Sequence, residues 1–174
     1  MDMIAGMPYP VFYAVVFHPA AAVLALAVGA DGAIRLCFLL VIAIQTWQVR
    51  KLCVSVGSGE KMAWLTAALM GWATYSMTNL ATRGAMAEFV GASLLVSAMA
   101  SLMRGGLPGT AESRPRLLFQ GCFFYALAAG THPITGLLGA LFLVTVPGPL
   151  VICAWRKMFA PIAAGAVIVV CVLV

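Results

Sequence analysis

The segment TNLATRGAMAE, residues 78–88, places an arginine and a glutamate between two long apolar runs. Charges are scarce in this chain: 9% of its 174 residues are charged and 64% are hydrophobic, and the mean hydropathy is +1.08. Because about 25% of the residues in a soluble domain are charged, the composition predicts a protein that lives in a lipid bilayer. An ionisable pair beside a membrane span is costly to keep, which makes Arg83 and Glu88 candidates for a functional site.

Backbone polar groups in lipid must be hydrogen-bonded within the chain, so the expected fold is all-α, a polytopic transmembrane helix bundle. A spanning helix needs about 20 residues, and about six helices are expected to span. They correspond to the apolar segments 33–49, 62–80, 85–103, 117–130, 134–154 and 159–174. The first ten residues resemble the tail of a loop and the last run stops at Val174. We therefore expect a single transmembrane domain, residues 1–174, truncated at both ends.

A seventh apolar segment, residues 11–28, is interrupted by His18-Pro19. It has two interpretations: a span, or a broken amphipathic helix that lies along the outer interface. Proline disfavours a single straight span. The aromatic side chains of the segment suit the interface, where a ring and its polar tip are both accommodated. We favour the second interpretation, with residues 1–30 forming an outer-face interfacial segment.

Basic residues gather in three loops, at residues 50–61, 103–116 and 156–157. The positive-inside rule places these loops in the cytoplasm. The second of them is rich in glycine, proline and charge, so it is expected to be a flexible linker. The turns that hold Arg83 with Glu88, and His132, carry almost no net positive charge and alternate with the basic loops. They are therefore expected to share the opposite, outer face.

This alternation predicts a substrate-binding site at the outer mouth of one cavity. Arg83, Glu88 and His132 are expected to lie close together there, with Tyr13 and His18 on the rim. Glu88 lies inside an apolar helix, and a buried ion without a partner costs several kcal/mol by typical estimates, so a partner across the bundle or a ligand is expected. Ordinary structural roles stay open: an ion pair or interfacial anchor for Arg83, and a polar turn residue for His132.

Several kinds of site have no counterpart in the sequence. The five cysteines show no metal-ligand spacing with either histidine and are expected to be apolar filler. The common nucleotide, metalloprotease and hydrolase motifs are missing, so we expect no metal and no cofactor. The net charge of +5 is divided among short loops, and nucleic acid is not an expected partner. Trp47, Trp64 and Trp155 are typical of membrane anchors, and Gln45 and Gln48 of hydrogen bonding between helices.

Several short motifs, taken in order, resemble the polytopic GT-C-type glycosyltransferases: Pro8-Tyr9-Pro10-Val11-Phe12-Tyr13, Ala33-Ile34-Arg35-Leu36 and the basic helix end Arg50-Lys51. The segment Thr78–Glu88, an apolar helix and then Thr131-His132-Pro133-Ile134-Thr135 look more closely like the bacterial membrane domain labelled "6-pyruvoyl-tetrahydropterin synthase-related". That label does not imply the soluble pterin enzyme, because nothing here looks like its zinc site. The resemblance covers nearly the whole chain.

The resemblance implies an inverting transfer of a sugar from a polyprenyl-phosphate sugar at the outer face of a bacterial inner membrane. It implies that Arg83 pairs with the lipid-linked phosphate, that Glu88 orients Arg83 or a sugar hydroxyl, and that His132 contacts the leaving phosphate. The family's first helix and first outer loop would precede this chain, and that loop usually carries the catalytic aspartate or glutamate. Here Asp2 stands alone and Asp31 is in the wrong place, so the catalytic residue is unassigned.

A non-enzymatic transporter, or a structural subunit of a membrane complex, is the alternative. A transporter is expected to place polar residues near the middle of several helices. In this chain the ionisable groups gather at one face, which favours interfacial chemistry on a lipid head group. The expected partners are membrane lipid and, for the transferase interpretation, a polyprenyl-phosphate sugar.

Overall fold

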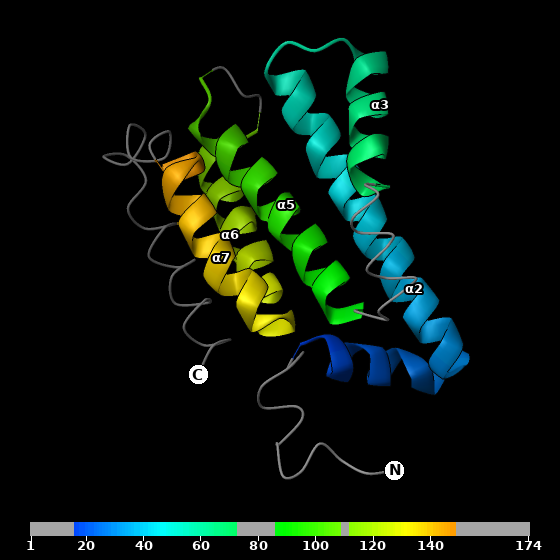
Figure 1. Cartoon of the computed structure of the whole chain (residues 1–174). Helices are drawn as coiled ribbons and strands as arrows, with labels where there is room; N and C mark the ends of the chain where they lie inside the picture. The colour runs from blue at the N-terminus through cyan, green and yellow to red at the C-terminus, as the bar shows by residue number, and fades with distance from the viewer. Residues whose placement is uncertain (1–15, 73–85, 109–111, 149–174) are drawn as a thin grey trace.

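The computed structural model describes residues 16–72, 86–108 and 112–148, and these ranges contain helices and no strand. The helices are α2 (Phe17–Ser55), α3 (Glu60–Gly71), α5 (Met86–Gly106), α6 (Arg114–Thr131) and α7 (Pro133–Thr145). They form a bundle in which most of the helices run roughly side by side (Figure 1). The predicted all-helical class is confirmed for the described residues.

The bundle is built outward from the hairpin of α5 and α6, which make the most extensive contact. α7 packs on both of them, α2 packs against α5, and α3 packs against α2. Small residues allow the helices to approach closely: a Cβ on Gly136 would lie 2.7 Å from the backbone Cα of Ala129. Because chain direction alternates, the α2–α3 turn and the ends of α5 and α6 joined by the linker lie at one end. The start of α5 and the α6–α7 turn lie at the other end (Figure 1).

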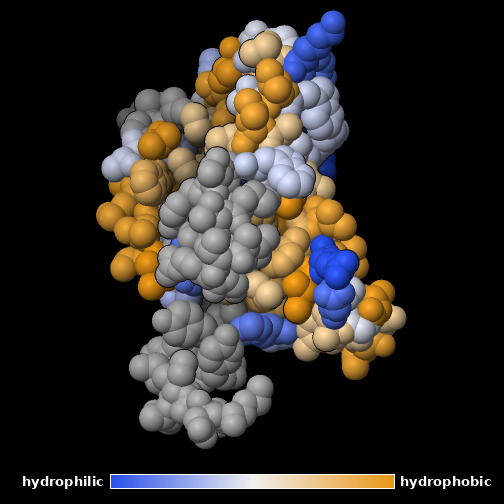
Figure 2. Space-filling model, turned by 45° about the vertical axis from the view of Figure 1, so that its right-hand side comes forward, coloured by the Kyte–Doolittle hydropathy of each residue, from blue (hydrophilic) through white to orange (hydrophobic). Residues whose placement is uncertain are grey.

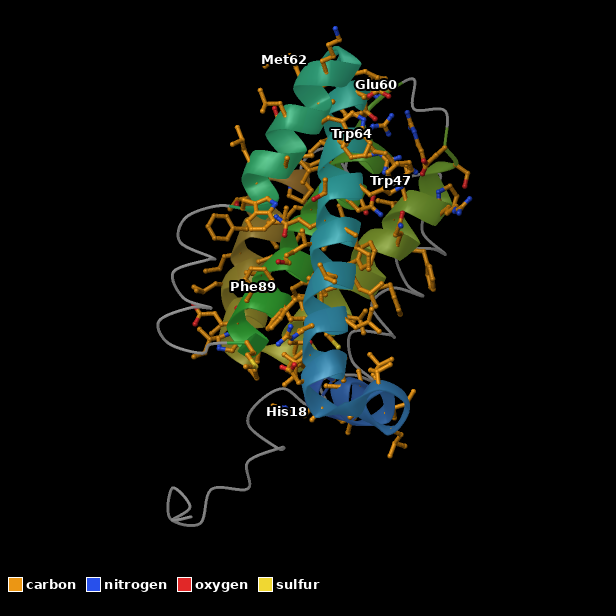
Figure 3. The ribbon with its side chains drawn as sticks, turned by 90° about the vertical axis from the view of Figure 1, so that its right-hand side faces the viewer. His18, Trp47, Glu60, Met62, Trp64 and Phe89 are labelled. Atoms are coloured by element: carbon orange, nitrogen blue, oxygen red, sulfur yellow. The ribbon has the colours of Figure 1, made fainter. Side chains whose placement is uncertain are left out.

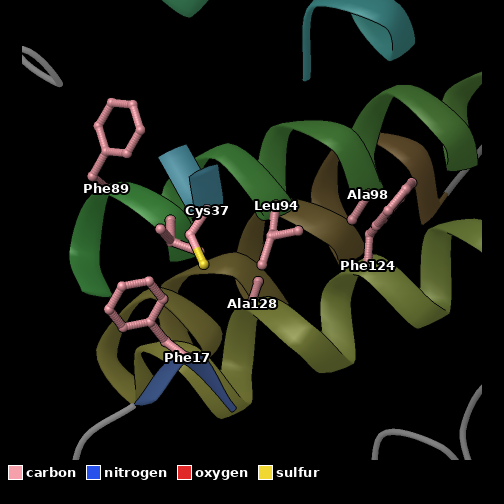
Figure 4. Close-up of a cluster of buried hydrophobic side chains, with 8 residues drawn as sticks. Phe17, Cys37, Phe89, Leu94, Ala98, Phe124 and Ala128 are labelled. Carbon is pink, nitrogen blue, oxygen red and sulfur yellow. The ribbon is translucent and has the colours of Figure 1, made fainter. Parts of the chain in front are cut away.

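The core lies where α2, α5 and α6 meet. Its buried side chains include Phe17 and Cys37 from α2, and Phe89, Leu94, Ala98, Phe124 and Ala128 from α5 and α6 (Figure 4). Phe38 meets Phe89 edge-to-face, with ring centroids 5.4 Å apart. Such a pair contributes about 0.5–1.5 kcal/mol beyond the burial of its area. The core therefore fixes α2 to the α5–α6 hairpin.

α2 is bent at Gly29, where φ is 75° and ψ is 164°. This backbone region is essentially restricted to glycine. The part of α2 before Gly29 lies across the end of the bundle, and the part after it runs along α5 (Figure 1). The sequence prediction placed the break at His18-Pro19, which is wrong. Helix α2 begins at Phe17, so Pro19 lies in the first turn, where an amide has no intrahelical partner to lose.

Two of the described helices, α2 and α5, are long and apolar enough to cross a membrane. The 21 residues of α5 span about 31 Å, which matches a hydrocarbon core of about 30 Å. The expectation of about six spanning helices is not met within the described residues. α3 and α7 have 12 and 13 residues there, α6 is less apolar, and the predicted span 159–174 lies outside the described residues.

Large apolar side chains cover the outside of the bundle. Only 11% of the most apolar stretch of α2 is buried, and Leu26 is 90% exposed. Figure 2 shows apolar side chains over much of the described surface in that view, with hydrophilic ones towards its upper edge and its lower part. A soluble monomer rarely exposes such contiguous apolar surface. Length, apolarity and exposure together indicate association with a membrane.

The linker between α5 and α6 is shorter than predicted. The predicted linker covers residues 103–116, but α5 continues to Gly106 and α6 already begins at Arg114. The glycine and proline content made the predicted linker too long, because Gly105 lies in α5 and packs against α6. A Cβ there would lie 2.9 Å from the side chain of Leu118. Pro115 lies in the first turn of α6, a position that favours proline.

Candidate functional site

The first part of α2 is attached to the turn between α6 and α7. The amide of Val16 donates a hydrogen bond to the carbonyl oxygen of Gly130, with N···O 3.1 Å. Phe17 is buried in the same core cluster as Phe89 near the start of α5. The next residue, His18, has its ring 5.5 Å from that of Phe17, centroid to centroid. The bend at Gly29 and these contacts place His18 at the end of the bundle where α5 begins.

His132 is the residue that caps the start of α7. Its Nδ1 accepts a hydrogen bond from the amide of Thr135 at 3.2 Å and lies 2.7 Å from the hydroxyl oxygen of the same residue. The hydroxyl and the amide can both donate to Nδ1, so the neutral ring carries its proton on Nε2. Pro133 at the first helical position is pre-organised for the helix start. The cap fixes His132 with its Nε2 edge as a hydrogen-bond donor.

Glu88 lies in the first turn of α5, at the same end of the bundle. It is half-buried, and acidic side chains are common in the first turn of a helix because the helix dipole is positive there. One turn further along α5, Gly91 packs against the cap: a Cβ on Gly91 would lie 3.0 Å from the Cβ of His132. α5 and the α6–α7 turn therefore meet closely beside Glu88. The sequence prediction that Glu88 lies within an apolar helix is confirmed.

Three of the five sequence-predicted site residues are described, and all three lie at this end. His18 is labelled there in Figure 3, and Glu88 and His132 lie at the starts of α5 and α7, which Figure 1 shows at this end. Arg83 and Tyr13 lie outside the described residues, so the roles predicted for them stay predictions. One polar atom here was not predicted. The hydroxyl of Thr131 is buried, its residue is 1% exposed, and it has no hydrogen-bond partner in the structure. Such a group normally has water or a ligand as its partner.

This end of the bundle combines an acid, two imidazoles and a buried hydroxyl at the termini of apolar helices. Imidazole nitrogens and hydroxyls hydrogen-bond phosphate or sugar oxygens, and a carboxylate accepts from sugar hydroxyls. Among the described residues no three side chains of the His, Cys, Asp and Glu types are grouped to hold a metal ion. The chemistry that these groups can supply is hydrogen bonding, charge and proton transfer.

The opposite end carries an ionic cluster that sequence reasoning missed. Arg104 has a side chain only 4% exposed and reaches two acceptors. Its Nη1 donates to Gln48 Oε1 at 3.1 Å, and its Nη2 lies 2.8 Å from Glu112 Oε1. Lys51 Nζ lies 2.7 Å from the same carboxylate oxygen. The cluster fixes the α5–α6 linker to α2, and the predicted hydrogen bonding of Gln45 and Gln48 between elements is confirmed.

The two cations lower the pKa of Glu112. The hydrogen bond from Lys51 is the largest cause. Burial, the second largest, acts in the opposite direction, and the nearby charge and hydrogen bond of Arg104 add to the lowering. The carboxylate is therefore ionised throughout the neutral range. The alternation of basic loops was the available signal, because it placed the loops of Lys51 and Arg104 on one side.

No protein-family model, curated protein or solved structure matches this chain.

Proposed function

We propose that this chain is an integral membrane protein that binds the phosphate-bearing head of a membrane lipid at the end that holds His18, Glu88 and His132. One observation carries the proposal: the first part of α2 lies across that end and is bonded to the α6–α7 turn. It brings polar side chains to the termini of helices whose sides are apolar and exposed. Polar groups at that height meet lipid head groups in a bilayer.

The membrane placement extends to several helices in this proposal. α2 and α5 have the length and apolarity of spans. α6 and α7 pack along α5, and α7 exposes large apolar side chains such as Leu137 and Val144. Helices packed side by side with a span occupy the same depth, so we assign a multi-pass protein. The first part of α2 then lies along the interface, and the resemblance to bacterial proteins favours an inner membrane.

The more specific proposal is a polyprenyl-phosphate sugar as the bound lipid, with the chain acting in glycosyl transfer. The support is the sequence resemblance together with the fixed donor edge of His132, which suits a phosphate oxygen. In this scheme His132 contacts the leaving phosphate and Glu88 accepts from a sugar hydroxyl. Arg83 is assigned to the phosphate from the sequence alone. No described residue is assigned as the catalytic base.

A transporter is less well supported by the same observations. Transporters bind substrate near the middle of the membrane, often at broken helices. The break in α2 is at Gly29, at the end of the bundle, and beyond it the exposed pair Asp31–Arg35 has its N···O at 2.9 Å. Apart from Arg104 in its last turn, the buried polar side chains of α5 are serines. Ser97, for example, donates to the carbonyl of Ser93 at 2.9 Å. These bonds satisfy the hydroxyls within the helix.

The test uses the full chain in lipid nanodiscs and a C55 polyprenyl phosphate, with binding measured by native mass spectrometry. His132→Asn removes the imidazole and keeps an N-cap, because asparagine is among the best capping residues. We expect the variant to bind at least about tenfold more weakly, the effect of about 1.4 kcal/mol from one lost charged hydrogen bond. Lys61→Gln, at the opposite end, is the control and is expected to bind normally.

Two results would contradict the proposal. One is the absence of binding by the unmodified chain above that of a matched phosphatidylcholine. The other is equal binding by His132→Asn and the unmodified chain. Arg83→Ala tests the assignment made from the sequence: it is expected to weaken binding while membrane insertion, followed by alkaline extraction, is unchanged.

A further inference from the structure

A second surface, at the other end of the bundle, has a composition that the proposed function does not use. We call it the tryptophan ledge: Trp47, Arg50 and Lys51 of α2, with Glu60 and Trp64 of α3. The two indole rings lie 6.4 Å apart, centroid to centroid, at an interplanar angle of 56°. Figure 3 shows Trp47 and Trp64 near one another towards the end of the bundle where Glu60 lies, with His18 at the far end.

Basic side chains form cation–π contacts with both tryptophan rings of the ledge. The guanidinium carbon of Arg50 lies 5.0 Å from the centroid of each ring, and Lys51 Nζ lies 5.2 Å from that of Trp47. Each tryptophan is nevertheless 46% exposed. Arg50 also forms an ion pair with Glu60. Indole rings beside basic side chains, exposed at the end of apolar helices, are typical of the level of lipid head groups.

The ledge and its surroundings carry more positive than negative charge. Lys51 shares the carboxylate of Glu112 with Arg104, so one positive charge is left over in that trio. Arg50 is matched by Glu60, and the neighbouring Lys61 is exposed. Over the described residues this end has six cations and two carboxylates: Arg50, Lys51, Lys61, Arg104, Arg114 and Arg116 against Glu60 and Glu112. The surface is complementary to an anionic group.

We propose that the tryptophan ledge binds the head group of an anionic phospholipid. The phosphate lies against Arg50 and Lys51, and the indole rings lie at the boundary between head group and acyl chain. Basic pockets between membrane helices on the cytoplasmic side are suited to such head groups. The two tryptophans select the lipid over a free anion, because their exposed faces need an apolar neighbour. This proposal rests on the membrane placement and is independent of the lipid bound at the His132 end.

The test is fluorescence quenching of the full chain in liposomes by lipids brominated at the same acyl positions. Trp72→Phe and Trp155→Phe together leave only the two ledge tryptophans as emitters. We expect brominated phosphatidylglycerol to occupy the ledge about five times more readily than brominated phosphatidylcholine, the factor that one cation contributes at an anionic surface. Equal quenching by the two lipids would overturn the proposal.

Charge variants make the test specific. Arg50→Gln is expected to remove the preference, and Arg35→Gln, the same charge change about four turns earlier in α2, is expected to keep it. Glu60→Gln removes the acid that competes for Arg50 and is expected to increase the preference. A loss that is equal in Arg50→Gln and Arg35→Gln, or no increase in Glu60→Gln, would overturn the proposal. Removal of the preference by inorganic phosphate at about 10 mM, a concentration on the order of the Kd of a weak ion site, would also overturn the proposal, because the site would then bind a free anion.

Discussion

Gly91 and His132 are in direct contact, because a side chain on Gly91 would begin 3.0 Å from the Cβ of His132. The contact joins α5, which carries Glu88, to the turn that orients the imidazole. Only a residue without a side chain permits this approach. The spacing of the proposed lipid site is therefore set by packing between helices as well as by its polar residues.

Gly91→Ala is expected to displace His132 and weaken lipid-phosphate binding. The added methyl group must move the histidine by a few tenths of an ångström, and overpacking of this kind costs about 1–3 kcal/mol. Binding of C55 polyprenyl phosphate and thermal unfolding in detergent measure the two effects. Gly32→Ala, where the new Cβ would meet only the Val28 side chain at 3.3 Å, is the control. Normal binding by Gly91→Ala would show that the contact does not position the site.

Gly29→Ala is expected to destabilise the protein by about 1–3 kcal/mol, because φ 75° with ψ 164° is strained for any side chain. The variant relieves the strain by straightening α2, which pulls His18 away from the α6–α7 turn. Unfolding in detergent measures the stability, and a cysteine cross-link between positions 16 and 130 reports the contact. Gly59→Ala has an ordinary φ of −62° and open space around it, so it is expected to be neutral. Equal stability of the two variants would contradict the backbone conformation described at Gly29.

Acid is expected to weaken the attachment of the α5–α6 linker to α2. Lys51 and Arg104 lower the pKa of Glu112 in the folded state. A carboxylate with a lowered pKa stabilises the fold at pH values above its unfolded pKa of about 4.3. This contribution is lost as the pH falls through the folded pKa. Glu112→Gln is therefore expected to be less stable than the unmodified chain at pH 7. The difference in melting temperature should shrink as the pH falls below about 4. A difference independent of pH would show that the charge of Glu112 is not responsible.

Thr131→Val is expected to leave the fold unchanged or to stabilise it. The Thr131 hydroxyl is buried without a partner, and an apolar group of the same shape removes a desolvation cost of about 1–3 kcal/mol. If the lipid hydrogen-bonds this hydroxyl, the variant binds polyprenyl phosphate more weakly and its melting temperature is not lowered. Melting in detergent without lipid, compared with binding in nanodiscs, separates the two roles. A strongly lowered melting temperature would mean that the hydroxyl has a partner within the protein.

The predicted sidedness can be tested by labelling single cysteines in a cysteine-free background. Ser58 and Ser113 are exposed at the basic end and are expected to react from one side of the membrane. Thr131 is buried and unsuitable for labelling, so Ile134, 56% exposed, represents the opposite end. The arrangement is wrong if Ser58 and Ile134 react from the same side.

Sequence patterns located the helices well where apolar runs are bounded by turn signals. The predicted segments 85–103 and 117–130 became α5 and α6 with ends displaced by three residues or fewer. The break in α2 was misplaced because proline is a strong breaker only beyond the first turn, whereas the bend at Gly29 accompanies the placement of the first part of α2 across the end of the bundle. The predicted segments 62–80 and 134–154 are longer than α3 and α7, and both continue into residues outside the described part of the chain.

The candidate site was also predicted only in part from the sequence. Charge alternation placed Glu88 and His132 at one end, because it requires only that helices alternate in direction. His18 was placed there by the interfacial interpretation of residues 1–30. Charge alternation could not reveal the Gly91–His132 contact or the unpartnered hydroxyl of Thr131, which depend on how three helices pack. Nor could it show that Arg104 is buried, because a basic residue at a helix end is normally exposed to water or head groups.

Photo-crosslinking with a diazirine-bearing polyprenyl phosphate, followed by peptide mapping of the full chain in nanodiscs, locates the lipid on the protein. We expect unmodified polyprenyl phosphate to compete with the label. We also expect the label to fall on the segments around His18, Glu88 and His132, and His132→Asn to reduce it. Labelling confined to the α2–α3 end, or labelling that the unmodified lipid does not compete away, would contradict the proposed lipid site.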